Sequence, residues 1–190
     1  MILHSCREAL EERIAALMPV PPEGSMLRSC ARDTEGMVRA YFRDGMEFLS
    51  RGDRVNALAS FSYALGWMDA GICLGLLSSC GCGIPVPATP EPHSGDGNGT
   101  LREKTSRYHA LLSRALGSLE SAPEPDTCLS RGGARILLIG EIFRARGAGL
   151  ESAGDDEGAL VSFSYGFGWL DAGVRNGLFR VALNRELFTI

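Results

Sequence analysis

The sequence predicts an all-α protein in which tandem duplicated three-helix bundles pack together as a pseudo-dimer. Three observations predict this fold: a long internal repeat, apolar residues that recur at helical spacing, and no segment with the alternation typical of a half-buried strand. The composition suits a globular chain, because 45% of the 190 residues are hydrophobic and 22% are charged.

Two segments of the chain are so similar that they indicate a duplication. Gly52–Leu76 and Gly154–Leu178 align without a gap, and 15 of their 25 positions carry the same residue. The period of 102 residues is much longer than the roughly 20 to 50 residues of a solenoid unit, so each copy should form its own core. A bundle of this size hides only about 60 to 65% of its unfolded surface, and we therefore expect the two copies to dock on each other.

Each copy is expected to start with a helix that opens at a capping box. Ser5 with Glu8 provides this pattern in the first copy, and Thr100 with Glu103 provides it in the second. Apolar residues at helical spacing follow in both copies, until prolines that cannot continue a helix end the element. These prolines are Pro19, Pro21 and Pro22 in the first copy and Pro123 and Pro125 in the second.

Glycine followed by aspartate separates the second helix from the third in both copies. Gly52 and Gly154 suit the left-handed conformation that closes a helix, and Asp53 and Asp155 suit the N-cap of the helix that follows. The pattern predicts a tight helical hairpin in each copy. The predicted ranges are 34–51 and 134–152 for the second helix and about 53–79 and 155–187 for the third.

The third helix is expected to be enclosed by other helices. When residues 57–76 are placed at about 100° per residue, the positions shared by the copies fall all round the helix, whereas one-sided packing would keep a single stripe. Gly66, Gly71 and Gly75 also lie in the predicted helix, and each costs about 1 kcal/mol relative to alanine. Close approach of another helix backbone would offset that cost.

A segment rich in proline and glycine separates the two copies. It can neither continue a helix nor supply a core, so we interpret it as a linker. His93 falls within it and is expected to be a solvated loop residue. The predicted organisation is a first bundle at residues 1–80, a linker at 81–99 and a second bundle at 100–190.

Charge and composition favour a cytoplasmic protein that binds neither nucleic acid nor a membrane. The net charge of -4 provides no basic excess, no apolar run is long enough to span a bilayer, and charged residues interrupt the region where a signal peptide would be apolar. The six cysteines are expected to be free thiols. Cys80 and Cys82 lack the further ligands of a zinc site, so no metal or cofactor is expected.

Aromatic and acidic residues of the third helices are the candidate ligand-binding residues: Tyr63, Trp67 and Asp69 in the first copy and Tyr165, Trp169 and Asp171 in the second. An aromatic pair beside a carboxylate can hold a cation or a ligand ring. The alternative is structural, with aromatic rings in the core and each aspartate bonded to the nearby Ser62 or Ser164. No catalytic motif accompanies these residues, so no catalytic residue is predicted and the chain is not expected to be an enzyme.

The motif Gly-Asp-x-x-x-Ala-Leu-x-Ser-Phe-Ser-Tyr-x-x-Gly-Trp-Met/Leu-Asp-Ala-Gly occurs at Gly52–Gly71 and again at Gly154–Gly173. It resembles the signature of the archaeal domain of unknown function 357 family. The resemblance implies an antiparallel three-helix bundle per copy and an archaeal cytoplasmic source, but it brings no assigned activity. This chain departs from the usual single-copy form in having two copies.

Three kinds of function remain open from the sequence. The first is a non-enzymatic interaction module that presents helix faces to a protein partner or self-associates. The second is tetratricopeptide-like peptide binding, which the turn and the helix after Gly52 resemble, although true arrays recur about every 34 residues. The third is a small-molecule or nucleotide site at the aromatic and acidic residues of the third helices.

Overall fold

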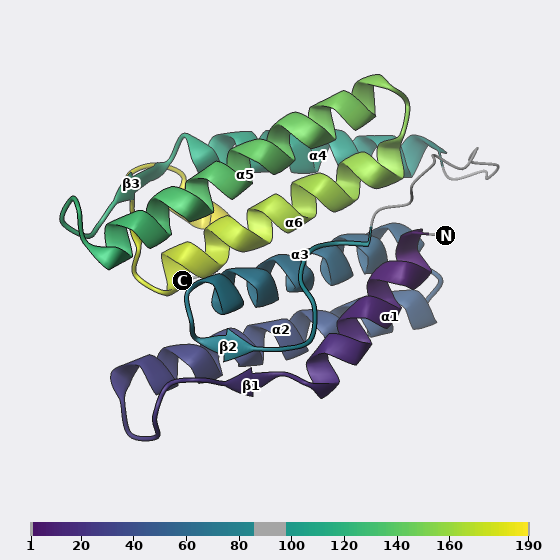
Figure 1. The fold of residues 1–190 in the computed structure, drawn as a ribbon. Coiled ribbons are helices and arrows are strands. Elements are labelled where there is room, and N and C mark those ends of the chain that lie inside the picture. Colours follow the sequence, from purple (N-terminus) through teal and green to yellow (C-terminus); the bar gives the residue numbers. More distant parts are fainter. Residues whose placement is uncertain (1, 86–97, 190) are drawn as a thin grey trace.

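The computed structural model describes residues 2–85 and 98–189, and these residues form an all-α fold of two tandem bundles, as predicted (Figure 1). In the first copy the helices are α1 (Ile2–Ala15), α2 (Met26–Ser50) and α3 (Arg54–Cys73). In the second copy they are α4 (Asn98–Leu116), α5 (Cys128–Ser152) and α6 (Asp156–Arg175), followed by the short 3-10 helix η1 (Arg185–Leu187). None of the helices in the described part of the chain is long and apolar enough to cross a membrane.

Each copy also has one small antiparallel ribbon that the sequence did not predict. Strand β1 (Met18–Pro19) pairs with β2 (Leu77–Ser78), and β3 (Leu119–Ser121) pairs with β4 (Phe179–Val181). Each ribbon joins the segment after the first helix of a copy to the segment after its third helix. Strands of two or three residues are too short to show a period of two, which explains why the pattern gave no sign of them.

Helices α3 and α6 lie side by side at the centre of the molecule and run in the same direction (Figure 1). At their C-terminal ends the Asn176 side chain donates to Thr34 Oγ1 of α2 over 3.2 Å, which joins the second copy to the first. Every residue from Gly158 to Val174 of α6 is buried, and α3 is buried on all sides from Ala57 to Gly71 apart from Ser60. The prediction of an enclosed third helix is therefore confirmed.

The two central helices approach most closely at a pair of equivalent glycines. A Cβ atom on Gly66 would lie 3.2 Å from the Cα of Gly168, and a Cβ on Gly168 would lie 3.2 Å from the Cα of Gly66. The Cβ on Gly66 would lie even closer to the backbone carbonyl oxygen of Tyr165, and the Cβ on Gly168 would lie even closer to that of Tyr63. The glycines thus allow direct backbone contact between the copies, which is the compensation expected for glycine inside a helix.

The hairpin between the second and third helices forms as predicted. Gly52 and Gly154 have φ values of 80° and 83°, and Asp53 and Asp155 accept hydrogen bonds at 3.0 and 2.8 Å from backbone N–H groups of the following helix. The third helices nevertheless end earlier than expected, at Cys73 and Arg175. Positive φ values of 71° at Gly75 and 75° at Gly177 close these helices, so Gly75 is a helix terminator and not a helix residue.

The predicted starts of the first and second helices are wrong by several residues. Helices α1 and α4 begin before the expected capping boxes, at Ile2 and Asn98. Helix α2 begins at Met26 because Ser25 caps it, accepting from the Arg28 N–H at 3.1 Å, and Thr127 caps α5 in the same way. These first turns of α2 and α5 carry no continuous apolar stripe, and so periodicity did not detect them.

The inter-copy segment is described only in part. Residues 81–85 are not helical, α4 begins at Asn98 within the range predicted as a linker, and His93 lies outside the described residues.

Candidate functional site

The six candidate residues lie together along the interface between α3 and α6, and all six are buried. The tyrosine of each copy donates its hydroxyl hydrogen bond to the aspartate of the other copy. Tyr165 Oη donates to Asp69 Oδ2 over 2.7 Å, and Tyr63 Oη donates to Asp171 Oδ2. The site is therefore one reciprocal arrangement across the pseudo-twofold axis, and not two separate sites.

The expected bonds between the aspartates and neighbouring serines do not occur. Ser62 Oγ donates to the Leu58 carbonyl at 2.8 Å within its own helix, and Ser164 Oγ has no hydrogen-bond partner among the described residues. A buried serine readily bonds to the carbonyl one turn earlier, which leaves the aspartates to bind partners from other elements.

The tryptophans fill the core beside the tyrosines. Trp67 is fully buried and Trp169 is 6% exposed. Neither indole N–H makes a hydrogen bond within the described structure. Their role in the structure is to pack the core.

Asp69 has a cationic partner that sequence reasoning missed. Arg13 of α1 is buried, and its guanidinium forms an ion pair with Asp69 Oδ1. The backbone N–H of Gly83 also donates to Asp69 Oδ2 over 2.8 Å. Arg13 follows Leu10 on the buried face of α1, and this cation on an apolar stripe was the available signal for the ion pair.

Asp171 has a different set of partners. It is fully buried and accepts hydrogen bonds from the Thr189 N–H at 2.9 Å and the Thr189 hydroxyl at 2.6 Å, besides the bond from Tyr63. The position equivalent to Arg13, 102 residues later, is the buried Ala115. No ion pair within residues 2–85 and 98–189 includes Asp171.

The tyrosines are held in their neutral, hydrogen-donating form. Burial, followed by the negative charge of Asp171, raises the pKa of Tyr63 well above its ordinary value. Burial and the charge of Asp69 raise the pKa of Tyr165 in the same way. Both hydroxyls therefore remain donors at neutral pH.

Asp171 and the two residues that bind it, Tyr63 and Thr189, form a group that we call the Asp171 cluster. A cavity of about 190 Å³, which we call the tyrosine cavity, lies next to this cluster. Tyr63 and Thr189, two of the residues that bind Asp171, form part of its wall. Aromatic rings form much of the rest, and Tyr41 meets Tyr63 edge to face with ring centroids 4.5 Å apart. The lining residues are Tyr41, Ser60, Tyr63, Tyr108, Phe167, Leu187 and Thr189.

A second cavity of about 300 Å³ lies between α1 and the segment from Cys80 to Pro85. Cys80 and Cys82 line it and are exposed free thiols. Within the described ranges no three side chains of the metal-binding types gather at one place.

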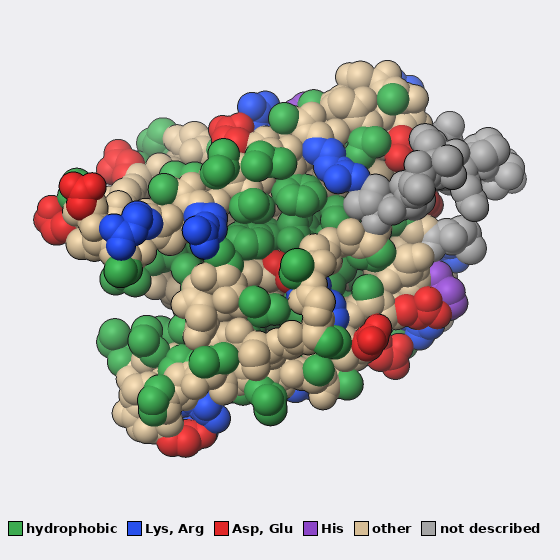
Figure 2. Space-filling model, in the orientation of Figure 1, with side chains coloured by type: hydrophobic (Ala, Val, Ile, Leu, Met, Phe, Trp, Pro, Cys, Tyr) green, Lys and Arg blue, Asp and Glu red, His purple; other side chains and the backbone are tan. Residues whose placement is uncertain are grey.

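Strand β1, the loop after it and the first turns of α2 and α5 carry exposed apolar side chains, and Figure 2 shows apolar side chains at the end of the molecule where α2 and α5 begin, as well as over the middle of this face. We call this group, made of Met18, Val20, Met26, Leu27 and Leu129, the end surface. Its largest exposed fractions are 80% at Met26 and 63% at Met18. Leu27 and Leu129 are equivalent residues of the two copies, so both bundles contribute to it.

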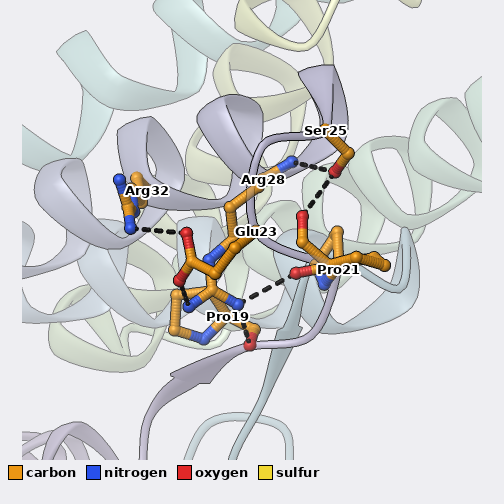
Figure 3. A network of polar contacts seen from close by, with 7 residues as sticks. Pro19, Pro21, Glu23, Ser25, Arg28 and Arg32 are labelled. Carbon is orange, nitrogen blue, oxygen red and sulfur yellow. Dashed lines mark hydrogen bonds and ion pairs between the residues drawn. The ribbon is translucent and has the colours of Figure 1, made fainter.

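An arginine network holds the loop between β1 and α2, which adjoins the end surface (Figure 3). Arg28 Nη1 donates to the carbonyls of Pro19 and Pro21 at 3.0 and 2.9 Å. Glu23 bridges Arg28 to Arg32, which it contacts at 2.8 Å. These contacts bind the loop that carries Val20 to the first turns of α2.

The fold and this site define an all-α protein made of two copies of one three-helix domain, joined by reciprocal tyrosine–aspartate pairs. The family described as protein of unknown function (DUF357) matches residues 7–77 and again residues 107–179. The chain belongs to this family and contains two tandem copies of its domain. Neither the curated proteins nor the solved structures contained a match to it.

Proposed function

We propose that this protein is a non-enzymatic interaction module that binds a protein partner through the end surface. The observation that carries the proposal is the exposure of Met18, Val20, Met26 and Leu27 on β1, on the loop after it and on the first turn of α2, where Arg28 binds the loop backbone by two hydrogen bonds. Binding to a rigid surface costs less conformational entropy than binding to a flexible one, which favours recognition there.

The composition of the end surface suits a protein partner. Its apolar centre is rich in methionine, a residue enriched in protein interfaces, and such interfaces combine an apolar centre with a polar rim. Glu23 and Arg32, with side chains 63% and 62% exposed, supply charged groups at its border. We infer a partner that presents apolar side chains, with complementary charges around them.

The hydrogen bonding of the buried aspartates supports a binding role over catalysis. Both are occupied by hydrogen bonds from tyrosines and from later segments of the chain, so neither is placed as an open general base. A cytoplasmic location fits the free thiols, and it remains, like an archaeal source, a prediction of the sequence.

Site-specific photo-crosslinking tests the proposal. A photoreactive phenylalanine analogue is placed at Met26 in the end surface or, as the control, at Leu138, which is 59% exposed on α5. In source lysate we expect a protein adduct at position 26 that excess unlabelled chain competes away and that the Leu27→Asp chain does not. Equal adducts at both positions, no protein adduct at position 26, or competition by the Leu27→Asp chain would contradict the proposal.

A further inference from the structure

We propose that the tyrosine cavity binds the protonated primary amine of a small organic molecule, with its ammonium group directed toward the Asp171 cluster. This inference does not depend on the end surface. It follows from the difference between the two buried aspartates, from the hydroxyls of the cavity wall and from its aromatic rings.

The two halves of the interface differ in one charge. Asp69 has the Arg13 guanidinium beside it, whereas the donors to Asp171 among the described residues, Tyr63 and Thr189, are neutral. A buried carboxylate is stabilised by a nearby cation, and the first copy supplies one from its own chain. Ala115 occupies the position of Arg13 in the second copy, so the first helix supplies no cation to Asp171. The tyrosine cavity lies beside Tyr63 and Thr189, the two residues that bind this carboxylate.

The two wall hydroxyls nearest Asp171, those of Tyr63 and Thr189, favour a ligand that donates hydrogen bonds. Tyr63 and Thr189 both use their hydroxyl protons to bind Asp171. Their oxygen atoms can then only accept a hydrogen bond from a molecule in the cavity. An ammonium group with N–H donors meets this requirement, whereas a carboxylate would be repelled and a quaternary ammonium has no N–H to donate.

The rings add attraction for a positive charge. Tyr41, Tyr63, Tyr108 and Phe167 line the cavity, and the faces of aromatic rings are electron-rich. The ring of Tyr108 already has an ammonium over it, since Lys104 Nζ lies 5.4 Å from the ring centroid while bonded to Asn56. Lys104 is not one of the residues that line the cavity.

The volume limits the ligand to a small molecule. A cavity of about 190 Å³ has the volume of roughly six water molecules in the liquid. A chain of four carbons with one amine fits this size. A lysine side chain also consists of four carbons that end in an amine. The ligand could therefore be a free small amine or an accessible lysine side chain of another protein.

Calorimetric titration of the full chain with n-butylammonium tests the inference, with 1-pentanol as the neutral control of similar shape. We expect butylammonium to bind at least about tenfold more tightly than pentanol. The Asp171→Asn variant should lose at least about tenfold in affinity for butylammonium, whereas Asp69→Asn, which changes the other half, should bind as the wild type does. Titration with Nα-acetyl-lysine methylamide distinguishes the sources: binding as tight as that of butylammonium indicates a lysine side chain, and much weaker binding indicates a free amine.

Three results would overturn the inference. They are a dissociation constant for butylammonium above about 10 mM, equal affinity for butylammonium and pentanol, and full affinity in a folded Asp171→Asn variant. The first two use only the wild-type chain, so the test does not depend on the stability of a variant.

Discussion

Gly66 and Gly168 face each other across the centre of the molecule, and a Cβ atom on either would lie 3.2 Å from the Cα of the other. A larger residue at either position would meet backbone atoms of the other helix, which cannot rotate away as a side chain can. The first prediction follows from this relationship.

Gly168→Ala should destabilise the protein by about 1 to 3 kcal/mol, since the added methyl group must push the central helices apart. Urea denaturation followed by tryptophan fluorescence measures this change. Gly36→Ala on α2 is the matched control, because no described atom outside its own stretch of helix lies within 4 Å of the added Cβ. That variant should gain up to about 1 kcal/mol from helix propensity. Equal effects of the two substitutions would show that the helices do not meet at Gly168.

Removing one tyrosine hydroxyl tests the pairing between copies. Tyr165→Phe should cost about 1 to 3 kcal/mol, because it removes a hydrogen bond from the buried Asp69. Tyr41→Phe is the control, since among the described residues the Tyr41 hydroxyl has one long contact, of 3.5 Å with Thr189, and this contact is exposed. The free energy of unfolding should change much less in the control. A stability of Tyr165→Phe equal to that of the wild type would contradict the pairing.

The Arg13 ion pair should be far more important than any surface pair. Arg13→Met should cost about 3 to 5 kcal/mol, because it leaves the Asp69 carboxylate buried without its cation. The double variant with Asp69→Asn should recover much of this loss, since no charge then remains uncompensated. Arg39→Met, which breaks the exposed pair with Glu35, should cost at most about 1 kcal/mol. Thermal unfolding of the wild type and these three variants measures the order of their stabilities. If the double variant is no more stable than Arg13→Met, the loss is not a charge effect.

Alkaline pH should destabilise the protein partly through Cys6. Burial raises the pKa of the Cys6 thiol from 9.0 to about 12, so the folded state keeps a proton that the unfolded state loses. Its stabilising contribution is complete below pH 9 and is lost as the pH rises toward about 12. Over this range the slope is at most about 1.4 kcal/mol per pH unit.

Denaturation midpoints of wild type and Cys6→Ala, measured from pH 8 upward, check this expectation. The Cys6→Ala chain should show a smaller loss of stability between pH 9 and pH 11, while Cys128→Ala, which removes an exposed thiol, should keep the wild-type slope. The remaining slope should come in part from Tyr63 and Tyr165, whose pKa values burial also raises. Identical slopes in all three chains would exclude a contribution from Cys6.

Periodicity and glycine placement allowed the main elements to be predicted. The hairpins at Gly52 and Gly154, the enclosed third helices and the close approach at Gly66 all follow from the repeated motif. The ends of helices were predicted less well. Gly75 closes a helix only because its backbone takes a positive φ, and a glycine in a sequence does not show whether it lies inside a helix or terminates it.

The candidate residues were found as a set, but their partners were not. Each aspartate was expected to bond within its own copy, whereas it binds the tyrosine of the other copy. Arg13 and Thr189 were absent from the predicted set, because they lie 56 residues before Asp69 and 18 residues after Asp171. Local spacing carries no information on contacts over such separations.

The sequence by itself determined the duplication, the helical class and the burial of the third helices, because these depend on local propensity and on the period of apolar residues. Only the tertiary structure decided that Tyr63 and Asp171 come from different copies, that Arg13 neutralises Asp69 and that a cavity lies beside Asp171. The reason is physical: hydrogen bonds, ion pairs and cavities arise from how helices distant in sequence are placed, and this placement is set by the packing of the whole core.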